Sequence, residues 1–399
     1  MLEKKPGLHL GIDATNIRQG GGLTHLSQLL QAADPLAVGI ERVTVWSSES
    51  TRAALPVRPW LHYRTDSWMN ASLLRRVLGQ QYQLPRDLVA ARCDVLFSPG
   101  GTLPIWCPVP VVTMSQNMLP FEPLEAARFG RWSLMRFKMT LLRYTQSRSF
   151  HRADGLIFLT LYAETIVTKL LRNNAFEKAL IPHGIESRFF QVPRPPRALA
   201  DCTVTQPFRV LYVSILMPYK HQLQIALAVS QLRAEGIPIE MKFIGSSWGR
   251  YGIEFRALLD QLDPERKFLL WSGAEPFGQV HDFYKKSDLF VFASSCENMP
   301  NILIEAMAAG LPIASSDRGP MPEVLGDAGL YFNPEQPSSI ADALRRLAND
   351  VTLRANLAER ATAKAHTYSW SKCASDTFSF IAHVSKNCVD GTNAATFKN

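Results

Sequence analysis

The sequence lacks three features, and each absence excludes a class of protein. It has no apolar run of about 18 residues, so no helix should span a bilayer, and residues 1–13 lack the apolar stretch of a signal peptide. None of its six cysteines forms a C-x-x-C pair, which disfavours a zinc site and favours reduced thiols. No D-x-D triplet occurs, so a metal ion held by such a motif is not expected. We therefore expect a cytoplasmic protein without a bound metal.

Acidic residues are scarce in the first half of the chain relative to bases. Residues 1–190 hold 22 Lys and Arg against 14 Asp and Glu, whereas residues 191–399 hold 21 of each kind. This asymmetry favours an anionic partner for the first half, either nucleic acid or an anionic membrane. No helix-turn-helix, zinc-finger or RNA-binding motif is present, so no nucleic-acid partner is expected.

Strand-like and helix-like segments alternate along the whole chain, which predicts parallel α/β layers. Strands are expected at 8–12, 43–46, 95–97, 109–114, 155–159, 208–213, 239–244, 268–270, 289–292 and 312–315, and helices at 23–32, 222–235 and 301–309. The pattern predicts an α/β protein with two doubly wound domains that face a central cleft. In such sheets, ligands bind beyond the carboxyl ends of the strands.

A proline-rich stretch separates two halves of similar size. Gln191-Val-Pro-Arg-Pro-Pro-Arg197 holds three prolines, which excludes a helix interior or a central strand. We predict an N-terminal domain at 1–190, a linker at 191–200 and a C-terminal domain at 201–365. Residues 366–399 are predicted to form a C-terminal helix and tail that cross back to the first domain.

Two glutamates surround the start of a predicted helix. Glu297 lies in the loop after the buried strand 289–292, and Glu305 lies in the helix that Pro300 opens and Gly310 ends. Asn298 or Met299 is expected near the N-cap, with Asn298 the better capping residue. Unpaired N–H groups at a helix start suit a diphosphate, and the two carboxylates could reach sugar and ribose hydroxyls. Taken alone, Glu305 could equally be a solvent-facing helix residue.

The surroundings of this pair resemble glycosyltransferase family 4, retaining enzymes of the GT-B type with two Rossmann-like domains. The matching residues run from Glu297 through Glu305-Ala-Met-Ala-Ala-Gly-Leu-Pro312 and continue into 314–319, 323–329 and 333–334. The resemblance covers the C-terminal half and, more loosely, the rest. It implies that the domain 1–190 binds the acceptor and that the domain 201–365 binds the nucleotide-sugar. It implies a catalytic role for Glu297 and donor binding by Glu305 and by the helix start, Asn298, Met299, Pro300, Asn301 and Ile302.

The same resemblance assigns a phosphate-binding role to Lys220, in the loop after the strand 208–213, because an ammonium is a compact point charge. The family's phosphate-binding Arg is replaced here by Ile215, and Lys220 could also be a solvated loop lysine. Gly20, Gly21 and Gly22 match the family's glycine-rich loop, although such a run can also be a flexible turn. No histidine stands near Ser115, where many members have one, so Asn117 is the residue there that could contact substrate. The segment 183–186 is interpreted as structural.

The resemblance implies transfer of a hexose from a nucleotide-sugar to a lipid-linked or polysaccharide acceptor, with retention of configuration and without a metal. The segment 117–122 resembles the bacterial branch that builds surface polysaccharides such as O-antigen, which favours mannose or a 6-deoxyhexose from a GDP donor. Two other functions stay open. One is a non-catalytic nucleotide-sugar-binding partner of another transferase, and the other is a nicotinamide-dependent oxidoreductase, against which the missing G-x-G-x-x-G spacing argues.

Residues 128–152 are rich in bases and aromatic residues and hold no acid between Arg128 and Arg152. Trp132, Met135, Met139 and Leu142 recur at helical spacing. A basic amphipathic helix of this kind could lie on an anionic membrane at the inner face of the cytoplasmic membrane. The alternative is a helix that packs on its sheet and leaves solvated arginines outside.

Overall fold

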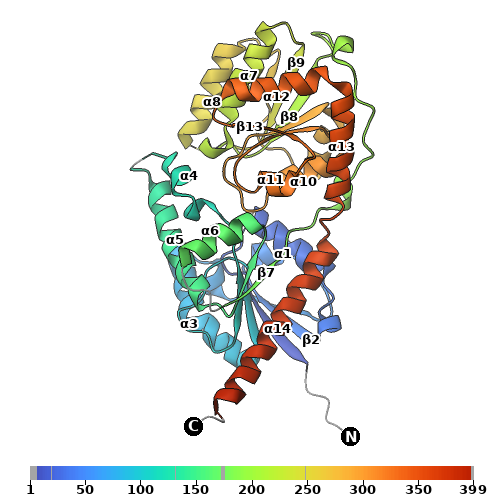
Figure 1. The fold of residues 1–399 in the computed structure, drawn as a ribbon. Coiled ribbons are helices and arrows are strands. Elements are labelled where there is room, and N and C mark those ends of the chain that lie inside the picture. Colours follow the sequence, from blue (N-terminus) through green and yellow to red (C-terminus); the bar gives the residue numbers. More distant parts are fainter. Residues whose placement is uncertain (1–6, 19, 131, 172–175, 248, 397–399) are drawn as a thin grey trace. The chain divides into compact units, whose positions relative to one another are not determined.

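The computed structural model of this chain describes residues 7–18, 20–130, 132–171, 176–247 and 249–396. They form two compact units (Figure 1). Unit 1 comprises Met1–Phe121, Phe137–Gly184 and Ser369–Asn399, and unit 2 comprises Glu122–Arg136 and Ile185–Tyr368. Each unit is a parallel sheet covered by helices, which confirms the predicted α/β class.

Unit 1 contains a seven-stranded sheet with the order β3-β2-β1-β4-β5-β6-β7. The pairs between neighbouring strands are parallel. Its strands are β1 (Leu8–Asp13), β2 (Ile40–Trp46), β3 (Leu61–Arg64), β4 (Val95–Ser98), β5 (Val111–Met114), β6 (Gly155–Phe158) and β7 (Glu177–Leu180). The order reverses direction between β1 and β4, and ligands of such sheets bind beside that point.

Helices cover both faces of this sheet. Gly11 of β1 leaves room for Leu88 of α3 (Leu73–Ala91), whereas Gly155 of β6 leaves room for Phe380 of α14 (Trp370–Thr396). A side chain at either glycine would collide with the helix above it, so these two positions let the layers approach closely. Helix α14 also packs against α1 (Gly21–Ala32). The remaining helical segments are η1 (Pro35–Val38), α2 (Glu49–Arg52), η2 (Ser67–Asn70), η3 (Leu119–Phe121), α5 (Leu134–Arg152) and α6 (Leu161–Leu171).

Unit 2 contains a six-stranded parallel sheet with the order β10-β9-β8-β11-β12-β13. Its strands are β8 (Phe208–Val213), β9 (Ile239–Ile244), β10 (Leu269–Trp271), β11 (Leu289–Phe292), β12 (Ile313–Ser316) and β13 (Leu330–Phe332). Helices α7 and α12 pack together, and so do α10 and α13. The helical segments are α4 (Pro123–Ala127), η4 (Ser187–Phe189), η5 (Leu199–Asp201), η6 (Pro218–Lys220), α7 (Gln222–Ala234), α8 (Gly249–Leu262), η7 (Phe277–Gln279), α9 (Val280–Lys286), α10 (Asn301–Ala308), α11 (Met321–Leu325), α12 (Pro337–Asn349) and α13 (Val351–Ala365).

The prolines at 193, 195 and 196 lie in irregular backbone that belongs to unit 2. This stretch is fixed to its unit, because Arg194 donates a hydrogen bond to the Ser287 carbonyl (2.6 Å) and Arg197 pairs with Asp288 at 3.1 Å. The chain first enters unit 2 for Glu122–Arg136, enters it again after Gly184 and returns to unit 1 at Ser369. The long helix α14 is therefore part of unit 1, as predicted for the end of the chain.

The strands that the sequence did not predict are β3, β7 and β13, which lie at sheet edges. Each of them holds half-buried or exposed positions, so none has the continuous apolar run of the buried strand β11.

In the part of the chain that the structure describes, no helix is long and apolar enough to cross a bilayer.

Candidate functional site

The sheet of unit 2 reverses its strand order between β8 and β11, and the loops after these two strands carry the predicted charged residues. Lys220 ends the short helix η6 after β8, and Glu297 lies in the loop between β11 and α10. Because the strands are parallel and adjacent, both loops leave the same edge of the sheet. This edge at the reversal point is where open α/β sheets bind ligands.

Lys220 and Glu297 form an ion pair within unit 2. Their side chains are only 7% and 16% exposed, so water screens the pair weakly. The Lys220 ammonium also lies over the rings of Tyr219 and Phe292, 5.3 and 5.7 Å from their centroids. Tyr212 donates a hydrogen bond to the Lys220 carbonyl at 2.8 Å, which fixes the backbone of the loop. The structure thus brings together the cation and the first carboxylate that the sequence singled out.

Glu305 is the buried member of the acidic pair. It lies on α10, is 7% exposed, and accepts a hydrogen bond from the Tyr284 hydroxyl at 3.0 Å. Burial raises the pKa of Glu305 to about 8, against the opposing effects of the Tyr284 hydrogen bond and the Arg188 charge. The solvent-facing alternative for Glu305 is therefore wrong. Its partner Tyr284 was not predicted, because it lies on α9, outside the motif around Glu305.

The start of α10 at Asn301 agrees with the predicted helix 301–309. The N-cap is Pro300, with φ −81° and ψ 74°, and the helix runs from Asn301 to Ala308 without a capping side chain. Asn298 and Met299 lie near the N-cap, as expected, but Pro300 itself takes the non-helical position before the first turn. Asn298 and Met299 are instead buried in the loop that carries Glu297. Asn301 and Ile302 form the first turn and are half-buried.

The predicted stop of this helix is confirmed. Gly310 takes a left-handed conformation with φ 67°, and its N–H donates to the Met307 carbonyl at 3.1 Å. This termination fixes the length of α10 and hence the position of Glu305 near its middle.

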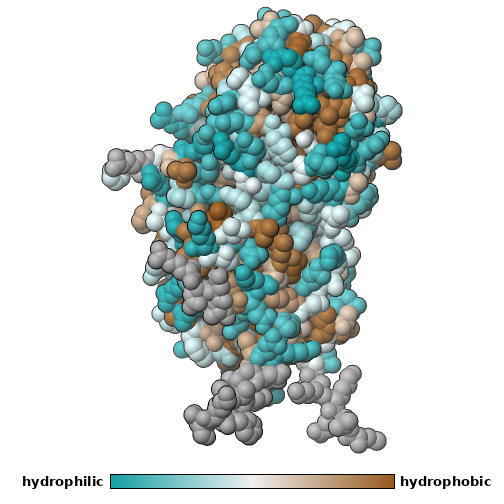
Figure 2. Space-filling view, in the orientation of Figure 1, coloured by the Kyte–Doolittle hydropathy of each residue, from teal (hydrophilic) through white to brown (hydrophobic). Residues whose placement is uncertain are grey.

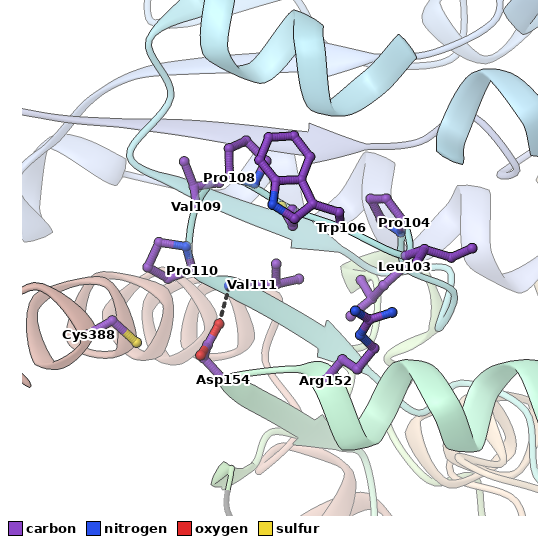
Figure 3. A pocket seen from close by; sticks show the side chains of 12 residues that line it. Leu103, Pro104, Trp106, Pro108, Val109, Pro110, Val111, Arg152, Asp154 and Cys388 are labelled. Atoms are coloured by element: carbon purple, nitrogen blue, oxygen red, sulfur yellow. Dashed lines mark hydrogen bonds between the residues drawn. The ribbon is translucent and has the colours of Figure 1, made fainter. Parts of the chain in front are cut away.

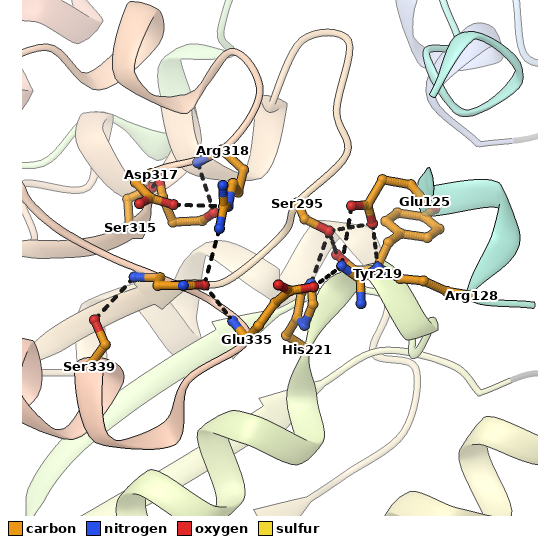
Figure 4. A network of polar contacts seen from close by, with 12 residues as sticks. Glu125, Arg128, Tyr219, His221, Ser295, Ser315, Asp317, Arg318, Glu335 and Ser339 are labelled. Carbon is orange, nitrogen blue, oxygen red and sulfur yellow. Dashed lines mark hydrogen bonds and ion pairs between the residues drawn. The ribbon is translucent and has the colours of Figure 1, made fainter. Parts of the chain in front are cut away.

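A second polar network, which the sequence motifs do not indicate, holds the Lys220 loop (Figure 4). His221 takes a left-handed conformation with φ 52°, and its Nε2 lies 2.9 Å from the Ser295 hydroxyl. Ser295 donates to Glu125 at 2.6 Å, and Glu125 pairs with Arg128 at 2.7 Å. Burial first, and the Arg128 charge second, lower the pKa of His221 to about 4. His221 is therefore a neutral ring that links the two site loops to the segment 122–136.

The position where the resembling family carries a phosphate-binding Arg holds Ile215, whose carbonyl accepts a hydrogen bond from Gln222 at 3.0 Å. Two other arginines of unit 2 belong to the network of Figure 4. Arg128 also pairs with Glu335, and Arg318 follows β12 and pairs with Asp317 at 3.2 Å. Both charges lower the pKa of His221, so both act electrostatically on the Lys220 loop.

The glycine run lies at the carboxyl end of β1 in unit 1, where α1 begins. Gly20 is the residue before the helix, with φ 70° and ψ −158°, a conformation reserved for glycine. A Cβ at Gly20 or Gly21 would point into open space, with no other group within 4 Å, whereas a Cβ at Gly22 would lie 3.3 Å from the Gln116 side-chain oxygen. The run therefore exposes backbone next to open space, as close approach by a ligand requires.

A histidine not singled out by the sequence lies one turn into α1. His25 is buried, its Nδ1 lies 3.2 Å from the Gln116 amide, and its ring stacks on His183 at 4.5 Å. Burial, assisted by His183, lowers the pKa of His25 well below its ordinary value. Asn117 accepts a hydrogen bond from the Leu119 N–H at 3.1 Å and so shapes its own loop.

Comparison with known proteins assigns most of unit 2 to a protein family. Residues 203–364 match the family model of the group 1 glycosyl transferases. This part of the chain is a group 1 glycosyl transferase domain. The match contains Lys220, Glu297 and Glu305 and leaves out the glycine run of unit 1.

Curated relatives match over part of their length. O-antigen chain mannosyltransferase B of Escherichia coli is 25% identical over 189 residues, 46% of this chain and 49% of the relative. The putative teichuronic acid biosynthesis glycosyltransferase TuaC of Bacillus subtilis is 23% identical over 217 residues, 53% of this chain and 52% of the relative. The chain spans about half, or less, of the length of the curated relatives that it matches.

Solved structures match over nearly the whole chain. Sucrose-phosphate synthase from Thermosynechococcus elongatus aligns with a TM-score of 0.72 and 15% identity, covering 97% of this chain and 100% of that one. WaaG, a glycosyltransferase involved in lipopolysaccharide biosynthesis, aligns with a TM-score of 0.67 and 16% identity, covering 94% of this chain and 99% of the other. Together with the two parallel sheets, these likenesses show that the group 1 domain is part of a GT-B fold with two Rossmann-like domains.

Proposed function

We propose that this chain is a retaining glycosyltransferase that moves a hexose from a nucleotide-sugar to an acceptor in surface polysaccharide biosynthesis. The observation that carries the proposal is the ion pair of Lys220 and Glu297 at the strand-order reversal of a group 1 glycosyl transferase domain. A cation for a diphosphate and a carboxylate for sugar hydroxyls are thus held beside each other. Glu305 on α10 supplies a second acceptor for ribose hydroxyls.

In this proposal the leaving nucleotide diphosphate is stabilised by Lys220 and by the start of α10, residues 298–302, and no metal ion takes part. Fixed charges and dipoles of this kind act without reorganisation when charge develops on the leaving group. Glu297 orients the sugar hydroxyls and is not the nucleophile. The acceptor hydroxyl then attacks from the face that the diphosphate leaves, which retains the configuration. The backbone of Gly20, Gly21 and Gly22 contributes to donor binding.

The finer assignment concerns donor and acceptor. We propose a GDP-linked mannose or 6-deoxyhexose as donor and a lipid-linked or polysaccharide acceptor. The likeness to a protein named O-antigen chain mannosyltransferase B supports a mannose-type donor. Discrimination between hexoses depends on hydrogen bonds to individual hydroxyls, which a site with buried polar groups can read strongly.

We further propose that the enzyme works in the cytoplasm, at the inner face of the cytoplasmic membrane, with residues 128–152 toward anionic lipid. Most of this segment is α5, which carries many bases and no acid. A peripheral contact of this kind would place the active site near a lipid-linked acceptor.

The test combines donor binding with transfer. Thermal shift with UDP-, GDP- and dTDP-sugars should identify one donor class, and transfer is then measured with that donor. We expect Glu297→Ala to lower kcat about a hundred-fold or more, whereas Glu305→Ala should mainly weaken donor binding. Glu254→Ala, on the exposed side of α8, serves as the matched control. Full transfer by Glu297→Ala would overturn the proposed role.

A second candidate function is a nucleotide-sugar-binding partner that does not catalyse transfer. Ile215 favours it, because this residue removes a cation from the diphosphate loop. Donor hydrolysis without an acceptor separates the two functions, since a binding partner would stabilise with donor in thermal shift but release no nucleotide diphosphate.

A further inference from the structure

Helices α3 and α5 of unit 1 lie on the same face of its sheet, and the loop 102–106 between them forms hydrogen bonds with both. Gln80 and Gln81 of α3 donate to the carbonyls of Thr102 and Leu103 at 3.2 and 3.3 Å. On the other side of this loop, the Leu103 N–H donates to the Ser149 hydroxyl of α5 at 2.9 Å. The outward sides of α3, the loop 102–106 and α5 therefore form one continuous surface.

The outward side of α5 carries apolar residues among its bases, and these residues are not the stripe that helical spacing suggested. Met139 is buried, and Met135 and Leu142 are half-buried, so these three residues of the stripe face inward, whereas its first residue, Trp132, is 91% exposed. The opposite side of the helix shows Phe137, Leu141 and Tyr144, which are 70%, 52% and 67% exposed. The alternative of a helix that packs inward and leaves arginines outside is thus confirmed for Met139 and for the exposed Arg148, and the exposed apolar residues are an addition to it.

Helix α3 and the loop add apolar side chains to the same surface. Leu84 and Leu88 of α3 pack into the core of unit 1. The opposite side of α3 carries exposed residues on successive turns. Five of the exposed apolar residues of helix and loop are Leu74, Leu78, Tyr82, Ile105 and Trp106. We call these five residues, with Phe137, Leu141 and Tyr144, the apolar face.

Small groups of hydrophobic residues also occur on other parts of the surface in view, so apolar exposure alone would select no partner (Figure 2). What distinguishes this face is the sign of the surrounding charge. Exposed bases stand among the apolar residues on both helices, and residues 71–86 and 126–153 contain no Asp or Glu. These exposed bases are Arg75, Arg86, Arg136, Lys138, Arg148 and Arg152.

A cavity of about 500 Å³ adjoins the face at the amino ends of β5 and β6 (Figure 3). Its walls come largely from residues 103–111, with Trp106 on one side and the Arg152 guanidinium on another. Asp154, the acid in this wall, accepts a hydrogen bond from the Val111 N–H at 2.7 Å. The cavity thus combines apolar side chains with one base and one acid, and of these the Arg152 guanidinium is the group that could meet an anionic headgroup.

We infer that the apolar face is the membrane-binding surface of the chain and that its partner is an anionic phospholipid bilayer, contacted by α3 and the loop 102–106 as well as by α5. Apolar side chains enter the interface while the bases meet the headgroups. The inference extends the proposed membrane contact to two further elements, and it does not depend on the transferase activity.

The experiment is cosedimentation of the full chain with vesicles of phosphatidylcholine, with and without phosphatidylglycerol. Binding should need phosphatidylglycerol and weaken with salt. Lys138→Gln with Arg148→Gln should weaken it roughly 30-fold, since each base contributes about 1 kcal/mol. Leu78→Ser with Tyr82→Ser on α3, and Trp106→Ser in the loop, should each weaken it about ten-fold or more.

Matched controls separate this face from general apolarity and charge. Ile253→Ser and Arg250→Gln change residues 72% and 90% exposed on α8 of unit 2 and should leave vesicle binding unchanged. Donor-induced thermal shift should be retained in every face variant, which shows folding and keeps failure of this inference distinct from failure of the proposed function. Binding that ignores phosphatidylglycerol, or is kept by the α3 and Trp106 variants, would overturn the inference. The inference would also be overturned if the chain formed a dimer that these substitutions dissociate, because the apolar face would then be a contact between two copies.

Discussion

The carboxyl edges of the two sheets differ in how they would handle a ligand. In unit 2 the edge carries an ion pair, Lys220 with Glu297, and a buried carboxyl, Glu305. In unit 1 the corresponding edge carries glycine backbone and a neutral buried His25. Two similar sheets can therefore divide the work, with charge recognition on one and close backbone approach on the other.

The strongest test of this division is to remove one charge from an ion pair in each unit. Lys220→Met should destabilise unit 2 by about 3–5 kcal/mol, because Glu297 is left as an unpaired carboxylate in a weakly screened site. Lys178→Met breaks the pair with Glu164 in unit 1, where both side chains are more exposed, and should cost under about 1 kcal/mol. Chemical denaturation of both variants measures the two values.

A double variant shows whether the loss comes from the stranded charge. Lys220→Met with Glu297→Gln should be more stable than Lys220→Met alone, since no unpaired charge is left in the site. Equal losses for the Lys220 and Lys178 variants would mean that the edges of the two units do not differ electrostatically.

The sequence predicted unit 2 well for a physical reason that concerns Glu297, Glu305 and Gly310. The two acids are spaced along one strand, loop and helix, so their spacing along the chain determines their separation in space. The contact of Lys220 with Glu297 needs in addition that β8 and β11 be neighbours, a feature of sheet order that the resemblance to a known family supplied.

A second test uses pH and concerns Glu305 alone. Its pKa rises from an ordinary value to about 8 on folding, so the folded chain binds a proton that the unfolded chain releases. The contribution of Glu305 to the free energy of unfolding is therefore largest below the ordinary carboxyl pKa, and it is lost as the pH rises through about 8. Between pH 6 and pH 8 the free energy of unfolding of the wild type should fall by about 2 kcal/mol more than that of Glu305→Gln.

Thermal denaturation of the two proteins across this pH range supplies the measurement. Tyr284→Phe is the matched variant, because it removes the hydroxyl that donates to the Glu305 carboxyl at 3.0 Å. Its loss of stability with pH should be steeper than that of wild type near neutral pH, since that hydrogen bond lowers the Glu305 pKa. Parallel pH curves for wild type and Glu305→Gln would show that Glu305 is ionised in both states.

The features that sequence could not predict all depend on contacts between distant segments. Glu125 and Ser295 are 170 positions apart, so nothing local announces their hydrogen bond. The same holds for α5, where two apolar stripes have helical spacing and only the packing of Met139 on the sheet decides which one faces outward. His221 takes a left-handed conformation that glycine adopts more readily, and its link to Ser295 explains how a histidine is held there.

The mildest substitutions test the backbone side of the comparison in unit 1. Gly20→Ala should destabilise the chain by about 1–3 kcal/mol, because φ 70° with ψ −158° is closed to residues with a Cβ. Gly21→Ala, one residue later, lies in the first turn of α1 with open space around it and should be neutral or stabilising by up to about 1 kcal/mol. The two substitutions add the same methyl group, so solvent exposure and side-chain size cancel between them. Thermal denaturation then isolates the conformation of Gly20. Equal melting temperatures for the two variants would mean that the run is a flexible turn, and the division of work between charge in one unit and backbone in the other would lose its support.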